Sequence, residues 1–272
     1  MIINHNISAT NSYRNFTNTN KDINSSLEKL SSGLRINRAG DDAAGLAISE
    51  KMRGQIKGLD MASKNAQDSI SLIQTAEGAL NETHSILQRM RELSVQSAND
   101  TNTTSDRAQL QQEVGQLLSE INRIGETTQF NGKNLLSGAF STNGLTFHVG
   151  ANNAQVVTLK IDSMRASALS VSNVSVSSQT GAESAITTVD AAIITVSTQR
   201  SKFGAMQNRL EHTINNLSTS AENLQAAESR IRDVDMAKEM VNYSKSSIIS
   251  QVGTSMLAQA NIRPQGVIEL FR

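Results

Sequence analysis

Residues 186–231, ITTVDAAIITVSTQRSKFGAMQNRLEHTINNLSTSAENLQAAESRI, follow one repeating pattern. Mostly apolar residues recur at alternating steps of three and four, at Ile186, Val189, Ile193, Val196, Arg200, Phe203, Gln207, Leu210, Ile214, Leu217, Ala221, Leu224, Glu228 and Ile231. This alternation averages about 3.5 residues, the period of a helix that supercoils against another helix. Such a helix would be roughly 70 Å long. It cannot bury its own stripe, so the chain must supply a partner.

Residues 52–98 carry a stripe that matches the first in length and period. Its members are Met52, Ile56, Leu59, Ser63, Ala66, Ile70, Ile73, Glu77, Leu80, His84, Leu87, Arg91, Ser94 and Ala98. A second stripe at sevenfold spacing lies beside it, at Leu72, Ala79, Ile86 and Leu93, which indicates contact with a further element or a neighbouring molecule. We therefore predict a mainly α fold, an elongated antiparallel helical rod or coiled-coil bundle in which 52–98 pairs with 186–231.

Two further helices are predicted outside this pair. The first spans 13–34 and ends near Gly33, while residues 1–12 predict no element. The stripe of 186–231 slips between Ile231 and Val234, which predicts a joint, and a helix then continues to about Ala260, before Pro264. The apolar faces of these outer helices can pair. Two helices alone make a poor core, so apolar surface should remain exposed, including Val267–Phe271 at the chain end.

The segments between the helices have recognisable turn and strand chemistry. Arg35–Gly40 reads as a connector, with Asp41 or Asp42 as a helix N-cap and with Arg35 and Arg38 close enough to pair with them. Cap residues at 99–106 predict a break, followed by a third, shorter helix that ends near Gly125. The segment 130–134 predicts a turn, 145–149 and 156–161 predict a β-hairpin, and 163–182 predicts irregular chain.

Composition argues against several classes of function. Lys plus Arg and Asp plus Glu both total 25, so charge gives no case for nucleic acid or an anionic membrane. Aromatic residues make up 3% of the chain, cysteine is absent, and no run of 18 apolar residues exists. The N-terminus lacks the regions of a secretory signal. The sequence predicts no membrane span and, if the protein leaves the cell, another route of export.

The sequence offers little material for catalysis. No phosphate-binding loop, zinc-protease motif or cysteine nucleophile is present, and the four histidines are isolated. We expect no enzyme activity, metal or cofactor. Arg89 and Leu93 lie four residues apart on one helical face, which reads as a solvated arginine beside one apolar rim residue.

Five motifs resemble those of bacterial flagellins. They are Leu30-Ser-Ser-Gly-Leu-Arg-Ile-Asn, Asp41-Asp-Ala-Ala-Gly-Leu-Ala-Ile, Leu87-Gln-Arg-Met-Arg-Glu-Leu, Gln129-Phe-Asn-Gly-Lys-Asn-Leu-Leu and Ser255-Met-Leu-Ala-Gln-Ala-Asn. The resemblance implies a structural subunit that polymerises into the flagellar filament for motility and is exported unfolded by the flagellar type III apparatus. Only about 50 residues separate the third helix from the returning one, so this is a short form without variable outer domains.

The resemblance also implies domains, partners and sites. Residues 1–40 plus 234–272 match the inner terminal coiled coil, and 41–233 match the outer rod domain with its β-hairpin region at about 130–182. Implied partners are further copies of the chain, an export chaperone at the C-terminal segment, filament cap and hook-junction proteins, and the animal Toll-like receptor five, in an extracellular filament. Arg89, Leu93 and Glu113 match the receptor-recognised positions. The polymerisation residues would be Phe16, Ile23, Leu27, Leu30, Leu34, Val241, Ile248, Val252, Met256 and Leu257.

Two alternatives stand beside the filament subunit. A hook–filament junction protein would share the rod fold and would not polymerise indefinitely. An enzyme on a flagellin frame is a poor third, because no zinc motif or inserted domain is present.

Overall fold

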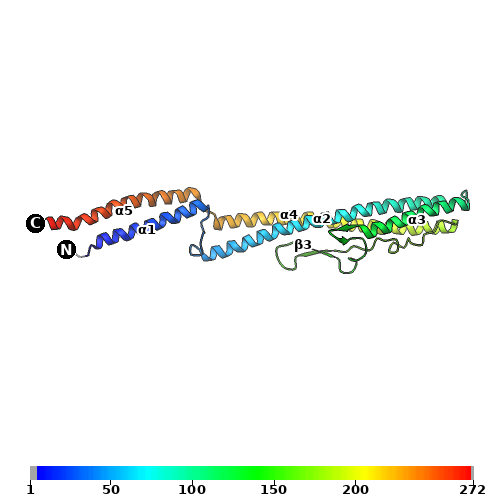
Figure 1. Cartoon of the computed structure of the whole chain (residues 1–272), viewed down its shortest axis with the longest axis horizontal. Helices are drawn as coiled ribbons and strands as arrows, with labels where there is room; N and C mark the ends of the chain where they lie inside the picture. Colours follow the sequence, from blue (N-terminus) through cyan, green and yellow to red (C-terminus); the bar gives the residue numbers. More distant parts are fainter. Residues whose placement is uncertain (1–4, 271–272) are drawn as a thin grey trace. The chain divides into compact units, whose positions relative to one another are not determined.

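The computed structural model describes residues 5–270 and folds them mainly into α-helices (Figure 1). Within this range lie α1 (Ile7–Ser32), α2 (Ala43–Ala98), α3 (Thr104–Thr127), α4 (Gln179–Arg232), α5 (Met236–Leu270), β1 (Gln129–Phe130), β2 (Lys133–Asn134), β3 (Leu145–His148) and β4 (Val156–Leu159). Contacts group the chain into two units, residues 1–54 with 222–272 and residues 55–221, and α2 and α4 contribute to both. The predicted mainly α fold with small β-hairpins is confirmed.

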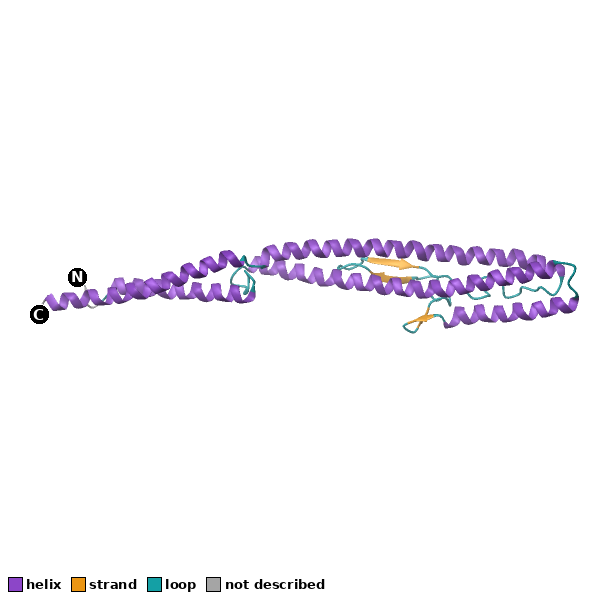
Figure 2. Ribbon diagram, turned by 90° about the horizontal axis from the view of Figure 1, so that it is seen from above, coloured by secondary structure: helices purple, strands orange, loops and turns teal. Residues whose placement is uncertain are grey.

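The helices of the 55–221 unit run antiparallel, as predicted (Figure 2). Arg91 Nε donates to Asp190 Oδ1 at 2.6 Å, and Gln207 Nε2 donates to Glu77 Oε2 at 3.3 Å. A residue nearer the start of α2 therefore contacts a residue nearer the end of α4, as expected for two antiparallel helices. The third helix, α3, lies alongside them and contributes Val114 and Ile121 to the same core.

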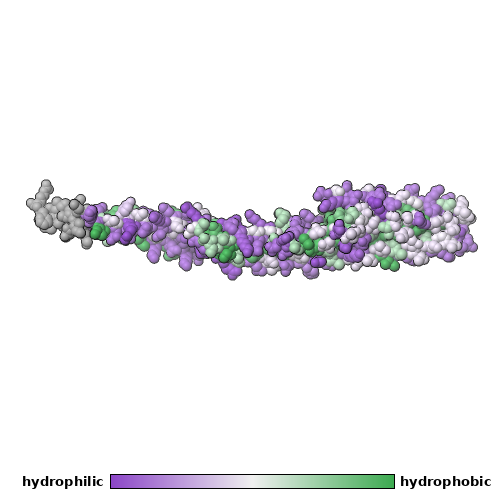
Figure 3. Space-filling view, turned by 90° about the horizontal axis from the view of Figure 1, so that it is seen from below, coloured by the Kyte–Doolittle hydropathy of each residue, from purple (hydrophilic) through white to green (hydrophobic). Residues whose placement is uncertain are grey.

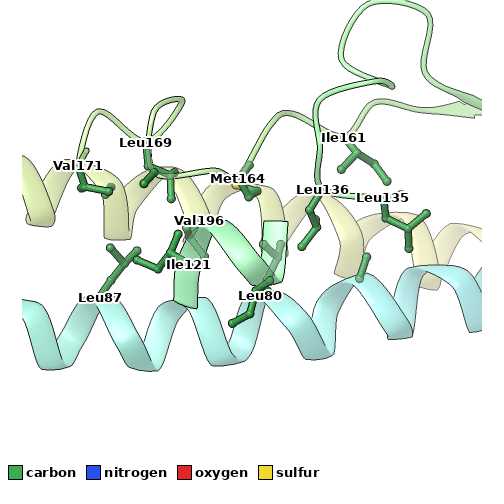
Figure 4. Close-up of a cluster of buried hydrophobic side chains, with 14 of the residues drawn as sticks. Leu80, Leu87, Ile121, Leu135, Leu136, Ile161, Met164, Leu169, Val171 and Val196 are labelled. Carbon is green, nitrogen blue, oxygen red and sulfur yellow. The ribbon is translucent and has the colours of Figure 1, made fainter. Parts of the chain in front are cut away.

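The core of this unit is closed by the chain between α3 and α4 (Figure 4). Leu80 and Leu87 of α2, Ile121 of α3 and Val196 of α4 converge from the helices, and each is fully buried. Opposite them lie Leu135, Leu136, Ile161, Met164, Leu169 and Val171. Burying that many large apolar side chains provides the main stabilisation of the unit.

The predicted turn and hairpin are both confirmed. Strands β1 and β2 are joined through Asn131 and Gly132, which adopt φ of 48° and 76°, as a two-residue type I′ turn requires. Strands β3 and β4 pair antiparallel from Leu145↔Leu159 to His148↔Val156. The irregular chain that follows is fastened by side-chain amides: Gln199 Nε2 donates to Lys160 O at 3.1 Å and Gln111 Oε1 accepts from Val176 N at 2.6 Å.

The ends of three helices differ from prediction. Helix α1 begins at Ile7 instead of near Tyr13, because the Asn6 side chain caps it by accepting from Ala9 N at 3.1 Å. Helix α4 begins at Gln179, before the predicted stripe that starts at Ile186, so the end of the segment 163–182 is helical and not irregular as predicted. Helix α5 continues to Leu270, so the predicted end near Ala260 is wrong. The predicted exposure of Val267–Phe271 lies outside the described side chains.

The connector between α1 and α2 is built from backbone caps. Gly33 closes α1 in the left-handed region at φ 72°, and Asp42 Oδ1 caps α2 by accepting from Gly45 N at 2.8 Å. Asp41 accepts from the backbone N–H groups of Asn37 and Arg38, each at 3.0 Å.

The predicted arginine–aspartate pairs in this connector are therefore wrong. The Arg38 side chain pairs with Glu28, and the Arg35 side chain donates to Ile231 O. Both aspartates accept from backbone N–H groups instead: Asp41 from the connector residues Asn37 and Arg38, and Asp42 from Gly45 at the start of α2.

The predicted joint after Ile231 is confirmed as a break between α4 and α5. Asp233 forms an isolated bridge with Leu34, and Val234 N donates to Gly33 O at 3.0 Å. Asp235 then caps α5 by accepting from Lys238 N at 3.1 Å. Two connectors distant in sequence thus share backbone bonds at one place.

Candidate functional site

The pairing surface between α1 and α5 is polar. Ser26 Oγ donates to Glu239 Oε1 at 2.7 Å, and Ser250 Oγ donates to Asn20 Oδ1 at 3.2 Å. The order of these contacts makes the pair antiparallel. The Ser26 hydroxyl holds the pKa of the Glu239 carboxyl below its usual range, because it donates to the ionised form. These hydrogen bonds help to fix the register of the two helices.

The residues of α5 that face α1 are small or polar along most of the helix. At least partly buried positions recur at steps of four and three, at Glu239, Tyr243, Ser246, Ser250, Gly253, Leu257 and Ala260. At Gly253 the ring of Phe16 lies so close that an added Cβ would sit 3.5 Å from it. This surface lets the helices approach closely and buries little apolar area.

The large apolar residues of α5 lie on the other face. Val241 is 68% exposed, Ile248 61%, Val252 54% and Met256 58%. They follow one another at steps of seven, four and four, so they form one stripe, which we call the α5 stripe. The prediction that the apolar faces of the two outer helices pair is wrong for α5. Only Leu257 of its predicted residues turns inward, where it is partly buried.

The predicted polymerisation residues of α1 are mostly partly buried, unlike those of α5. Phe16, Ile23 and Leu30 are partly buried, and Leu27 is 45% exposed. Leu34 lies beyond the end of α1, in the bridge to Asp233. On the face in Figure 3, green hydrophobic surface interrupts the hydrophilic surface where α1 and α5 lie. A shallow hollow on α5 is lined by Met240, Val241, Ser244, Lys245, Ile248 and Ile249.

One residue that sequence reasoning missed joins both helices near their ends. Asn6 Nδ2 donates to Ala260 O at 2.9 Å, while Asn6 Oδ1 caps α1. Ala260 lies four residues before Pro264, which has no N–H to offer the Ala260 carbonyl. Asn6 supplies the missing donor. An asparagine just before an apolar-periodic run is an N-cap signal that could have located it.

A second group of predicted residues lies in the 55–221 unit. Arg89 Nε donates to Glu113 Oε1 at 2.9 Å, and its Nη1 pairs with Glu92 at 3.1 Å. These two carboxylates raise the pKa of Arg89. Arg89 of α2 and Glu113 of α3 therefore lie together at the surface, where the side chain of each is about half exposed.

Leu93 is not a surface residue. It is 1% exposed and belongs to the hydrophobic core, so the interpretation of Leu93 as an apolar rim beside Arg89 is wrong. Residues 90, 93, 94 and 97 form a broad buried face of α2, and Leu93 is near its middle. Its contribution to the surface is indirect, because it anchors the turn that carries Arg89.

The described residues give no material for metal chemistry or membrane insertion. Within 5–270, no group of three or more His, Cys, Asp or Glu side chains could hold a metal ion. In the same range no helix is apolar over a stretch long enough to cross a bilayer. A stripe of exposed large apolar side chains on a terminal helix is typical of a surface that associates with other chains.

Comparison with known proteins identifies the family. Residues 3–141 match the bacterial flagellin N-terminal helical region, and residues 186–271 match the bacterial flagellin C-terminal helical region. The chain belongs to the bacterial flagellin family, whose members are structural proteins and not enzymes. The resemblance seen in the sequence motifs is thereby confirmed.

Individual relatives agree over the whole chain. A flagellin from Halalkalibacterium halodurans is 56% identical over 100% of both chains. The flagellar filament 33 kDa core protein of Treponema phagedenis is 53% identical, again over 100% of both. The crystal structure of Bacillus cereus flagellin is 34% identical with a TM-score of 0.50, and covers 61% of this chain and 94% of its own.

Proposed function

We propose that this chain is the subunit that polymerises into an extracellular flagellar filament for motility. The observation that carries the proposal is the α5 stripe, which the chain's own α1 does not cover. Solvent exposure of four large apolar side chains on one helix face is unfavourable at roughly 25 cal/mol per Å². Other copies of the chain are the occupants that the family relation supports, since a full-length relative is named as a filament core protein.

The asymmetry of the terminal pair favours an open polymer. The α5 stripe and the partly exposed face of α1 differ in composition, so a contact of the α5 stripe with α1 of another copy joins unlike surfaces. Contacts between unlike surfaces are heterologous, and they generate a helical filament when the rotation does not close a ring. We also propose that 1–40 plus 234–272 form the inner domain of the filament and 41–233 the outer one.

Seeded growth tests the proposal. Purified subunit added to short fragments of its own filament should extend them into long filaments, measured by electron microscopy. The variant Val252→Asp, which places a charge on the stripe, should abolish extension. The control Thr254→Asp adds the same charge at an exposed position outside the α5 stripe and should leave extension unchanged. Normal growth of Val252→Asp would contradict the role of the stripe.

The same experiment addresses the alternative function. A hook–filament junction protein adapts between two lattices and does not extend a seed. Failure of the unaltered subunit to elongate seeds, with its helices intact by circular dichroism, would favour the junction protein.

The uncovered α5 stripe also suggests how the subunit is handled before assembly. We propose that the subunit is exported unfolded by the flagellar type III apparatus, and that an export chaperone covers Val241, Ile248, Val252 and Met256 until then. Filament cap and hook-junction proteins would be the remaining partners at the filament ends. Loss of chaperone binding in Val252→Asp, with binding kept in Thr254→Asp, is the expected result; equal binding of both variants would contradict it.

The Arg89–Glu113 pair supports a second proposal, recognition by Toll-like receptor five of an animal host. The pair presents a fixed charged surface on α2 and α3, and buried Leu93 positions it. Arg89→Ala should weaken binding of the receptor ectodomain measured by calorimetry, whereas Arg123→Ala, which removes an exposed pair with Glu120 on α3, should not. Equal effects of both substitutions would contradict the proposal.

A further inference from the structure

The methionines within the described residues differ widely in exposure. Met90 and Met164 are buried in the core of the 55–221 unit, at 0% and 1% exposed. On α5, Met236 is 48% exposed, Met240 50% and Met256 58%. Outside α5, Met61 is 55% exposed and serves as a comparison. Because oxidants reach exposed thioethers first, this difference predicts site-selective oxidation.

Two of the three α5 methionines, Met240 and Met256, are part of the surface to which assembly is assigned. Met256 follows Val252 by one helical turn and continues the α5 stripe. Met240 lines the shallow hollow together with Val241 and Ile248. Apart from Lys245, the large side chains of this face are apolar, so a change of polarity at either methionine alters the contact surface itself.

We propose that Met240 and Met256 form an oxidation-sensitive switch of assembly, whose reactant is a hydroperoxide; the inference rests on the proposed function. The thioether sulfur attacks one oxygen of hydrogen peroxide, so an S–O bond forms and the O–O bond breaks. Sulfur loses two electrons and becomes the sulfoxide. The remaining oxygen takes up both protons and leaves as water.

Oxidation acts through desolvation of the new oxygen. A sulfoxide is a strong hydrogen-bond acceptor, and packing it against apolar side chains of another copy removes its bound water without a replacement. We expect subunits that are oxidised at both positions to elongate seeds at about one tenth of the untreated rate or below. This is the size of effect expected from burying one unsatisfied polar group. Assembled subunits should resist the same oxidant, because neighbouring copies cover these side chains.

The experiment treats purified subunit with hydrogen peroxide, removes the excess with catalase, and divides the sample. Peptide mass spectrometry should show sulfoxide at Met240 and Met256 before Met90 and Met164. The other part is added to unoxidised seeds and elongation is timed. Treatment with methionine sulfoxide reductases of both epimer specificities should restore the rate, which excludes irreversible damage.

Substitutions locate the effect. For Met240→Leu combined with Met256→Leu, the ratio of treated to untreated rates should be close to one, whatever the untreated rate is. For Met61→Leu, which removes a methionine of similar exposure outside α5, the ratio should stay as low as in the unaltered chain.

The outcomes separate this inference from the proposed function. If untreated subunit elongates seeds and oxidised subunit elongates them equally well, the switch is overturned and the proposed function stands. If the double leucine variant remains as sensitive as the unaltered chain, the switch is also overturned. If untreated subunit does not elongate at all, the proposed function fails, and the switch fails with it.

Discussion

Asn6 shows how one side chain can serve two helices. Its oxygen caps α1, and its amide nitrogen supplies the donor that Pro264 removes from the Ala260 carbonyl. A proline inside a helix costs about 3 kcal/mol or more, partly through that lost bond. The donor from α1 offsets part of this cost within α5, which continues past the point where the sequence predicted its end.

This role predicts a specific defect. Asn6→Asp keeps the capping oxygen and loses the amide donor, so the buried Ala260 carbonyl is left unsatisfied, at a cost of about 1–3 kcal/mol. Filaments of this variant should depolymerise at a lower temperature in a thermal melt followed by light scattering. The control Asn11→Asp makes the same change at an exposed site on α1. Equal melting of both variants would show that the bond is unimportant.

Two glycines of α2 should respond in opposite directions to alanine. A Cβ at Gly58 would lie 2.9 Å from Ala151 Cβ and 3.2 Å from its backbone Cα, so the β3–β4 loop must move, at a cost of about 1–3 kcal/mol. A Cβ at Gly78 meets nothing within 4 Å. Gly78→Ala should therefore stabilise by about 0.5–1 kcal/mol through helix propensity. Urea unfolding measures both, and the same sign for both would contradict the assigned contact.

The start of α3 has a predicted pH dependence. The Thr103 hydroxyl and N–H donate to Asp106 and hold the pKa of its carboxyl below the usual range. The folded pKa is the lower one, so this stabilisation is fully present above the ordinary aspartate pKa and is lost as pH falls through the folded value. Thr103→Ala should raise the Asp106 pKa in an NMR titration. The neighbouring change Thr101→Ala should not, and a shift with Thr101→Ala alone would contradict the capping box.

At the scale of helices, sequence periodicity correctly predicted about half of the buried positions on the contact face of each long helix. In α4 the positions at sevenfold spacing, Val189, Val196, Phe203, Leu210 and Leu217, are all buried, as predicted. The intervening buried positions are Ala185, Ala192 and Gln199, each one residue before the predicted Ile186, Ile193 and Arg200. Ile194, in the same stretch, is 66% exposed.

Helix α2 repeats this outcome. Ala66, Ile73, Leu80 and Leu87 are buried as predicted, whereas the intervening buried residues are Ser69, Ala76, Thr83 and Met90 in place of Ile70, Glu77, His84 and Arg91. The small side chains of Ser69, Ala76 and Thr83 let neighbouring elements approach closely. A search for apolar residues cannot find them, because Ala, Ser and Thr are equally common on exposed faces.

In the terminal helices, too, small or polar residues take buried positions that were predicted to be apolar. On α1 the sevenfold residues Phe16, Ile23 and Leu30 turn inward, and on α5 the inward side is almost wholly small or polar. The sequence predicted that apolar surface would remain exposed and did not predict which face. That choice depends on pairwise hydrogen bonds such as Ser26 to Glu239, which periodicity does not encode.

At the scale of the whole chain, the two units differ in how they are stabilised. The 55–221 unit has a continuous apolar core from three helices and the segment between them. The α1–α5 pair has polar contacts and an uncovered stripe. Because isolated helix pairs with little apolar burial are marginal, the free subunit should be least stable in this pair.

Limited proteolysis measures this difference. Brief digestion of the free subunit should trim segments of α1 and α5 and leave a resistant fragment that retains most of 55–221, identified by mass spectrometry. In assembled filaments the same sites should be protected. Equal resistance along the whole free subunit would contradict the assignment of low stability to the terminal helices.

A helical reconstruction of seeded filaments would show whether other copies of this chain cover the α5 stripe, because it shows what lies against each side chain. We expect Val241, Ile248 and Val252, which are 68%, 61% and 54% exposed in the single chain, to become buried against neighbouring subunits. A filament in which these three side chains remain in solvent and contact no other copy would contradict this expectation.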